Sequence, residues 1–251
     1  TISYPINLGS DISEYCNNSI LGNEMFFAGF TTANGYELWK SDGTVSGTVM
    51  VKDMTAGAGN TPMDGFTRLG SNVYFFTGLG QLWRTNGTDA STVNIPLPAG
   101  LTVYVYNTMV AYNGKLIFIG YDATNGMEPW ISDGTTAGTH IIANTSPRTD
   151  YYYVLKDLMF KEVPGGVLFQ QLMTSGSNKD TLWKTDGTSS GTVQLSNLDV
   201  IDEQSGLDFG MTQQSIYIYN LSQKTLFKSN YQPGGSSVIS QNLAYNQFKN
   251  F

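Results

Sequence analysis

Short apolar runs separated by turn residues dominate the hydrophobic pattern of the chain. Runs of this length, rich in β-branched and aromatic residues, are typical of β-strands. Gly-Asn, Gly-Ser, Asn-Gly and Pro-Gly-Gly sequences lie between the first two runs of most units, where a tight hairpin needs positive φ. In the first two units the predicted strands are a stretch ending near Ile20, then Glu24–Phe30, Tyr36–Ser41, Thr48–Lys52, Asp64–Leu69, Asn72–Thr77, Gln81–Thr85 and Thr92–Ile95.

The second run of each unit is apolar at successive positions, not at alternate ones. A strand with one wet face alternates, whereas a strand covered on both faces does not. We therefore expect this strand to lie inside a stack of sheets. Tyr151–Val163 also fits a helix, because its apolar residues fall at helical spacing, but its place in the unit is that of a first strand. The second runs are Met25–Ala28, Val73–Phe76, Leu116–Ile119, Val167–Gln170 and Ile216–Tyr219.

A repeated motif accounts for all four tryptophans of the chain. Tyr36-Glu-Leu-Trp-Lys-Ser-Asp-Gly-Thr44, followed by Gly47-Thr48, returns three times with small changes and a fourth time as the weaker Thr225-Leu-Phe-Lys-Ser-Asn230. The anchor aromatics are separated by 44, 47, 53 and 44 residues; they are Trp39, Trp83, Trp130, Trp183 and Phe227.

Four strands in a unit of about 40–50 residues is the period of a β-propeller blade. The sequence therefore predicts an all-β protein, a β-propeller with five blades of four antiparallel strands in one domain over 1–251. The alternative is a fragment of a larger propeller. Ser3–Leu8 and Ser237–Ser240 compete for the outer strand that closes the last blade. The predicted blades cover residues 9–53, 64–96, 103–143, 154–196 and 207–241.

The stretch that begins at Val51 also resembles a known family. It reads Val-Lys-Asp-Met-Thr-Ala-Gly, then Phe-Thr-Arg-Leu-Gly-Ser-Asn-Val-Tyr-Phe-Phe, then Leu-Trp-Arg-Thr-Asn-Gly-Thr. This resembles bacterial secreted and surface proteins with tandem Glu-Leu-Trp-x-Ser-Asp-Gly-Thr-x-x-Gly-Thr units, over residues from about 12 to 240. The second unit departs from the motif at Asn86 and Ser91, and the fifth at Asn230-Tyr-Gln-Pro-Gly-Gly. The resemblance implies a propeller-like extracellular module and brings no assigned reaction.

The aspartate of each repeated turn is interpreted as structural. An Asp that starts a turn accepts hydrogen bonds from amides two or three residues on, and Gly supplies an unusual φ. Calcium ligation is the alternative, but Asn in the second unit keeps the acceptor and loses the charge. The turn residues are Asp42, Asn86, Asp133 and Asp186.

The anchor tryptophans are interpreted as packing residues between blades. Trp39, Trp83, Trp130 and Trp183 each share a strand face with the residue two before, which is Glu37, Gln81, Glu128 or Thr181. Stacking on a carbohydrate is the alternative, and it needs an exposed ring.

Acidic residues occur near the start of the first strand in most units, where a propeller lines its axis. Asp64, Asp157 and Asp208 are the candidate ligand-binding residues of this kind. Converging carboxylates bind a cation or raise one another's pKa for acid–base work. A glycoside hydrolase that uses two of these carboxylates is the enzymatic alternative. The non-functional alternative is that the carboxylates are solvated or structural.

Tyrosines gather in the linkers that follow the fourth strands. Tyr beside Asn and Asp is typical of glycan and protein recognition surfaces, because the ring offers rigid area at low entropic cost. The alternative is that these rings fill gaps between blades. The candidates are Tyr104, Tyr106, Tyr151, Tyr152 and Tyr153.

Composition narrows the function further. Only 13% of residues are charged, against about 25% in ordinary soluble domains, and the net charge is −7 without a Lys/Arg cluster. This argues against nucleic acid and membrane partners. One cysteine, Cys16, and one histidine, His140, make no zinc site of ordinary composition. We expect a non-catalytic, extracellular or cell-surface recognition or assembly module, without a cofactor unless a cation lies on the axis, that binds a glycan or a protein.

Overall fold

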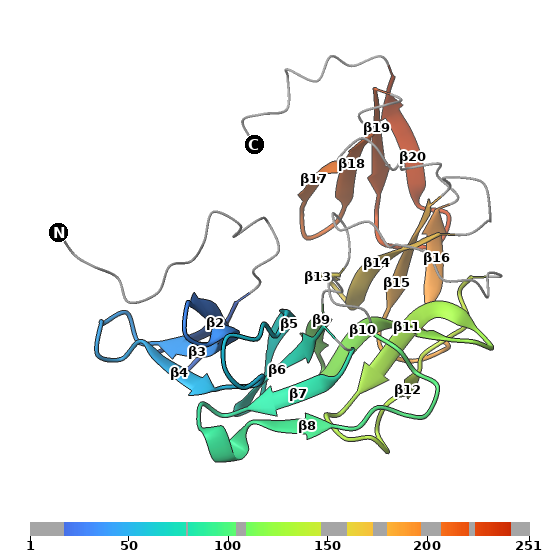
Figure 1. Ribbon diagram of the computed structural model, residues 1–251. Coiled ribbons are helices and arrows are strands. Elements are labelled where there is room, and N and C mark those ends of the chain that lie inside the picture. The colour runs from blue at the N-terminus through green and yellow to red at the C-terminus, as the bar shows by residue number, and fades with distance from the viewer. Residues whose placement is uncertain are drawn as a thin grey trace. The chain divides into compact units, whose positions relative to one another are not determined.

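The computed structural model describes residues 18–78, 80–103, 109–146, 160–172, 180–196, 207–220 and 224–241. In this part of the chain twenty strands form five antiparallel sheets, and each sheet takes four consecutive strands in order (Figure 1). We call each sheet a blade. The chain divides into two compact units, residues 1–120 with 131–140 and residues 121–130 with 141–251. Blades one and two belong to the first unit and blades four and five to the second, while the division passes through blade three.

Each blade is an ordered run of short strands. Blade one contains β1 (Ser19–Leu21), β2 (Glu24–Thr31), β3 (Gly35–Ser41) and β4 (Val49–Lys52). Blade two contains β5 (Met63–Leu69), β6 (Asn72–Thr77), β7 (Leu82–Thr85) and β8 (Val93–Ile95), with the 3-10 turn η1 (Asp89–Ser91) before β8. Blade three contains β9 (Met109–Tyr112), β10 (Lys115–Asp122), β11 (Gly126–Ser132) and β12 (His140–Ile141). Blade four contains β13 (Lys161–Val163), β14 (Gly166–Leu172), β15 (Asp180–Thr185) and β16 (Val193–Ser196). Blade five contains β17 (Leu207–Met211), β18 (Ile216–Asn220), β19 (Thr225–Ser229) and β20 (Ser236–Ser240).

The predicted strand pattern is confirmed. The eight strands predicted for the first two units are all present, with ends that agree within one residue. Of the segment Tyr151–Val163, the last three residues form β13, and 151–159 lie outside the described residues. The candidate outer strand Ser237–Ser240 is part of β20 and is the fourth strand of its blade, whereas Ser3–Leu8 lies outside the described residues.

Four of the five anchor aromatics each lie directly across from an apolar residue of the second strand in the register, which gives these blades two distinct faces. Residues two apart on a strand share a face, so Phe27 and Trp39 define what we call the tryptophan face of blade one. Phe26 and Leu38 define its opposite face. The register pairs are Phe27 with Trp39, Phe75 with Trp83, Phe169 with Trp183, and Ile218 with Phe227.

In the first unit, the opposite face of blade one packs on the tryptophan face of blade two. Phe26 and Leu38 are fully buried in one apolar cluster with Val73 and Phe75, and Trp83 packs against it. Burial of such side chains contributes about 1.5–3 kcal/mol each.

Blade two packs on blade three in the same sense. The rings of Phe76 and Phe118 meet edge to face at 5.3 Å. The Thr67 hydroxyl donates to the carbonyl of Met109, across the first strands of the two blades, over 2.8 Å.

The second unit repeats the arrangement, because one cluster joins the opposite face of blade four to the tryptophan face of blade five. Its members include Leu168, Leu182, Leu195, Ile216, Ile218 and Phe227.

A β-bulge in the outer strand adds a residue to the opposite face. In blade one, Leu38 pairs with Lys52 and Trp39 with Met50, which leaves Val51 without a partner in the register. A bulge bends its strand and re-aims the extra side chain. Val51 is 8% exposed and lies in the cluster shared with blade two. Leu195 is the equivalent bulged residue of blade four and is 1% exposed.

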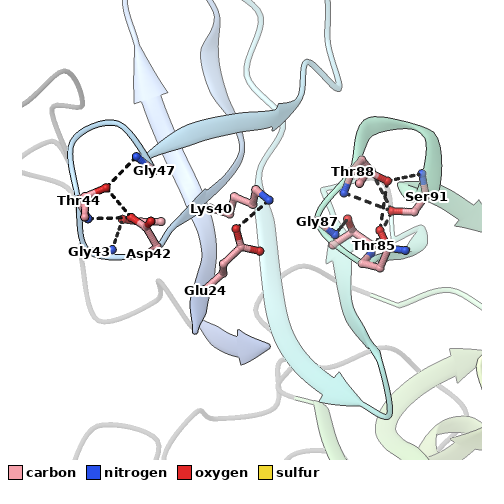
Figure 2. A network of polar contacts seen from close by, with 12 residues as sticks. Glu24, Lys40, Asp42, Gly43, Thr44, Gly47, Thr85, Gly87, Thr88 and Ser91 are labelled. Atoms are coloured by element: carbon pink, nitrogen blue, oxygen red, sulfur yellow. Dashed lines mark hydrogen bonds and ion pairs between the residues drawn. The ribbon is translucent and has the colours of Figure 1, made fainter. Parts of the chain in front are cut away.

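The repeated turn between the third and fourth strands is closed by its own side chains (Figure 2). Asp42 Oδ1 accepts from the amide of Thr44 at 2.9 Å and from its hydroxyl at 2.7 Å. The same hydroxyl oxygen accepts from the amide of Gly47 at 2.9 Å. Hydrogen bonds from Thr44 hold the pKa of the Asp42 carboxyl below its usual range. Asp133 with Thr135 and Asp186 with Thr188 make the same set of bonds.

The glycine that ends this turn is matched to the aspartate that begins it. A Cβ on Gly47 would overlap the carboxylate of Asp42, and the same holds for Gly138 with Asp133 and for Gly191 with Asp186. Blade two has a serine at this place and an asparagine at the start.

The serine of blade two takes over the acceptor role of the missing carboxylate. Ser91 Oγ accepts from the amides of Asn86 at 3.0 Å and Thr88 at 3.4 Å, and the Asn86 side chain keeps only the Thr88 hydroxyl, at 3.1 Å. Asp with Gly, or Asn with Ser, at the first and last positions therefore both allow the same turn to close through its own side chains.

We expect Gly47→Ser to destabilise the protein by about 1–3 kcal/mol, because the new side chain displaces the Asp42 carboxylate. Adding Asp42→Asn should recover much of this loss, since the double variant reproduces the turn of blade two. Urea unfolding of the four proteins in the cycle measures the coupling, which we expect at about 0.5–3 kcal/mol. Effects that simply add would contradict the matched-pair interpretation.

Candidate recognition surface at the linker end of the blades

A buried glutamate on the third strand holds the start of the linker that leaves blade one. Glu37 lies two residues before Trp39 and is fully buried. Its carboxylate accepts from the amides of Met54 and Thr55, the second and third residues after β4. Burial raises the pKa of Glu37 and the charge of Asp53 adds to the rise, while the two amides oppose it.

Glu128 does the same in blade three. Its Oε2 accepts from the amide and the hydroxyl of Thr145 at 2.7 and 2.6 Å, and its Oε1 accepts from the amide of Ser146 at 2.9 Å. Burial raises its pKa to about 7 against these hydrogen bonds, and the charge of Asp122 contributes to the rise. A buried carboxyl with three donors clamps the linker to the blade, because losing it would leave those donors unsatisfied.

The linker after blade one also packs on the hairpin between β2 and β3. Asn60 Oδ1 accepts from the amide of Tyr36 at 3.0 Å, and the amide of Thr61 donates to the carbonyl of Tyr36 at 2.9 Å. A Cβ on Gly35 would overlap the carbonyl oxygen of Gly59. Hairpin and linker therefore form one fixed edge of the blade, which we call the linker end.

The linker end of blade one presents amide and carboxylate groups. Asp53 and Asn60 are exposed and Asn34 is half-buried, and the Asn34 side chain donates to Asp53 over 3.4 Å.

In blade three the corresponding hairpin is capped by Asp122. Its Oδ1 accepts from the amides of Thr124 and Asn125 at 2.8 and 2.9 Å, and both its oxygens accept from the Asn125 side chain. Burial tends to raise the pKa of Asp122, but the hydrogen bonds from Asn125 and Thr124 outweigh it and lower the pKa. In the amide orientation that satisfies both ends, Asn144 donates to the carbonyl of Ser146 at 2.8 Å.

Among the predicted axial carboxylates, the side chain of Asp64 alone lies within the described residues. Asp64 is the second residue of β5, is 4% exposed, and accepts from the amide of Gly65 at 2.7 Å. Asp208 is the second residue of β17, where it pairs with Tyr219. The remaining candidates lie outside the described residues: Asp157, Tyr104, Tyr106, Tyr151, Tyr152 and Tyr153.

None of the four tryptophan rings is exposed. Trp130 is 8% exposed, and the other three are half-buried. The ring of Trp183 stacks on Phe169 at 6.3 Å, and its Nε1 donates to the Thr181 hydroxyl at 2.8 Å. This environment suits packing, since a sugar platform needs an open ring face.

Within the described ranges, no three His, Cys, Asp or Glu side chains gather where a metal ion would be held. The same residues contain no helix with the length and apolar character needed to cross a membrane.

Similar solved structures identify the fold, although no family model and no curated protein matches the chain. The chain is similar to AztD from Citrobacter koseri, at 13% identity and a TM-score of 0.53, over 92% of this chain and 59% of AztD. A prolyl endopeptidase matches at 11% identity and a TM-score of 0.56, over 91% of this chain and 35% of that one. The fold is a β-propeller.

This chain spans less than two thirds of AztD, of the prolyl endopeptidase and of the designed protein Ika8. The computationally designed protein Ika8 is similar at 9% identity and a TM-score of 0.50, with 89% of this chain and 60% of Ika8 covered. Identities this low show the fold alone.

Sequence reasoning missed the two glutamates as linker clamps. The sequence feature that could have revealed the clamps is a common spacing. Glu37 and Thr55 are 18 residues apart, and so are Glu128 and Ser146. In blades two and four the same strand position holds Gln81 and Thr181, so the pattern does not repeat in every unit.

The clamp predicts a specific pH dependence. Because the folded-state pKa of Glu128 is raised to about 7, the native state keeps a proton that the unfolded state releases, so stability falls as pH rises from about 4.5 to about 7. Each pKa unit corresponds to about 1.4 kcal/mol, so the loss reaches about 3 kcal/mol.

Glu128→Gln should be less stable than the parent at low pH, and the difference should shrink as pH rises through this window. Urea midpoints at several pH values measure it. Glu162→Gln, a change at an exposed glutamate of β13, is the control and should keep the slope of the parent. Parallel profiles for the parent and Glu128→Gln would rule the clamp titration out.

Proposed function

We propose that this propeller is a non-catalytic recognition or assembly module, outside the cell or at its surface, that binds a glycan or a protein through the linker end of its blades. The observation that carries the proposal is the anchoring of two linkers by buried carboxylates, through Glu37 and Glu128. Loops carry function when a rigid scaffold positions them.

Anchoring lowers the entropic cost of ligand binding, because the loop is already ordered before the ligand arrives. A linker fixed near its start and packed on a hairpin loses less conformational freedom when a ligand arrives. The linker after blade one has both attachments, through Glu37 at its start and Asn60 near its end.

The polar groups of the linker end suit a neutral, hydroxyl-rich or amide-rich ligand. Asn34 and Asn60 supply amide groups and Thr55 a hydroxyl, and these groups both donate and accept hydrogen bonds. The tyrosines predicted on the later linkers would add flat apolar area of the kind that sugar rings and peptide side chains contact.

A matched pair of alanine variants tests where binding occurs. Ala58 is exposed in the linker after blade one, and Ala90 is exposed in the turn of blade two. The labelled protein is screened on a glycan array and against cell-surface proteins, and any hit is titrated with both variants. We expect Ala58→Lys to weaken that hit by about tenfold or more, which is about 1.4 kcal/mol, and Ala90→Lys to leave it unchanged.

Two results would contradict the proposal. Equal loss from both variants would place binding away from the linker end. Absence of any glycan or protein hit, with a protein that is folded by circular dichroism, would count against a recognition role.

A further inference from the structure

The chain contains four Asn-Gly sequences, which begin at Asn34, Asn86, Asn113 and Asn125. Each lies in a hairpin or turn between two strands of one blade. An asparagine that precedes glycine loses its side-chain amide readily, because a glycine without a Cβ leaves its backbone nitrogen open to attack the preceding side chain. The hydrogen bonds within each turn therefore decide which of the four asparagines can react.

Two of these asparagines are held by side chains of their own hairpins. The Thr31 hydroxyl donates to Asn34 Oδ1 at 3.2 Å and accepts from the Asn34 backbone amide at 3.1 Å. Asn125 Nδ2 donates to the two carboxylate oxygens of Asp122, at 3.1 and 2.9 Å. Both side chains must lose these hydrogen bonds before they can turn toward the glycine nitrogen, and this slows the reaction.

Asn86 is held by the closed turn of blade two. The Thr88 hydroxyl donates to Asn86 Oδ1 at 3.1 Å. The backbone amide of Gly87, which contains the attacking nitrogen, donates to the Thr85 hydroxyl at 3.0 Å. Both reacting groups are therefore engaged within the turn.

Asn113 lies in the two-residue loop between β9 and β10, where Tyr112 pairs with Lys115. The backbone φ is 48° at Asn113 and 72° at Gly114, which is the pair of positive angles of a type I′ turn. The backbone alone forms this turn, because no group among the described residues hydrogen-bonds the Asn113 side chain. The comparison of the four sites involves only residues of the same blade in each case, so it does not depend on how the blades pack.

We propose that Asn113 is a site of spontaneous modification, at which the side-chain amide is converted to aspartate and isoaspartate through a cyclic imide with Gly114. The backbone nitrogen of Gly114 attacks Cγ of Asn113, and the N–Cγ bond forms as the Cγ–Nδ2 bond breaks. Ammonia leaves with the proton that the Gly114 nitrogen gives up, and water then opens the imide at either of its carbonyls. The inference does not depend on ligand binding at the linker end.

The modification changes the loop in two ways. Isoaspartate routes the backbone through the side chain, which adds a methylene group to a loop that a type I′ turn closes with two residues. Both products also add a negative charge next to Lys115, whose Nζ lies 3.6 Å from Asp133 Oδ2. We therefore expect isoaspartate to weaken the pairing of β9 with β10.

Ageing of the purified chain in mildly alkaline buffer tests the proposal. Peptide mass mapping over time should show loss of the amide at Asn113 about tenfold or more faster than at each of the other three sites, which is a difference of about 1.4 kcal/mol in activation free energy. In urea the turns are lost, so the four sites should react at similar rates.

Two variants test the cause of the selectivity. Asp122→Ala removes the hydrogen bonds that hold Asn125 and should bring its rate toward that of Asn113, while the rate at Asn113 stays unchanged. Thr31→Val makes the same test at Asn34 if Asp122→Ala does not fold. Asn113→Gly keeps the positive φ of the loop and should abolish the modification there, with a fold that circular dichroism checks.

Each measurement has an outcome that contradicts the proposal. A folded protein in which Asn113 reacts no faster than the other three asparagines would overturn it. A difference that persists unchanged in urea, or that Asp122→Ala and Thr31→Val both leave unaltered, would show that the hydrogen bonds of the turns do not select the site.

Discussion

The packing of a tryptophan face on the opposite face of the preceding blade, as seen for blades two, three and five, is the interaction on which the rest of the structure depends. A four-stranded sheet of this size cannot bury both its faces alone, so its second strand is apolar at consecutive positions and needs a neighbour on each side. Phe26 with Phe75 in the first unit and Leu168 with Ile218 in the second belong to such contacts. Stability therefore resides in the contacts between blades as much as in the blades.

The motif around the anchor aromatic serves this packing through three backbone devices. The Asp42 turn closes the connection to the outer strand without help from another blade. The bulge then delivers Val51 to the next blade, and Glu37 fixes the linker that leads there. Each device is local to one blade, yet its result is a surface that fits the next one. This explains why the residues around the anchor aromatic recur from blade to blade, while the linkers differ in sequence.

The strands and the two-faced character of the blades could be predicted because both depend on residues close in sequence. Consecutive apolar residues such as Val73–Phe76 predict a strand that is covered on both sides. The glutamate clamp could not be predicted in this way, because its partner lies 18 residues on and its distance depends on the bulge and on the path of the linker. The need for glycine at position 47 opposite Asp42 could not be predicted either, because it arises from a close approach of the two residues in the folded turn.

These contacts also limit where binding chemistry can reside. The repeating carboxylates are already engaged, Asp42 with the amide and hydroxyl of its own turn and Glu128 with the linker it clamps. A group that must hold the backbone in place is poorly suited to hold a ligand as well, because releasing it leaves donors unsatisfied. In the proposed recognition role, ligand contacts would therefore come from residues that the repeat leaves variable. Those are the linkers and hairpin tips, which the clamps hold at one end of the blades.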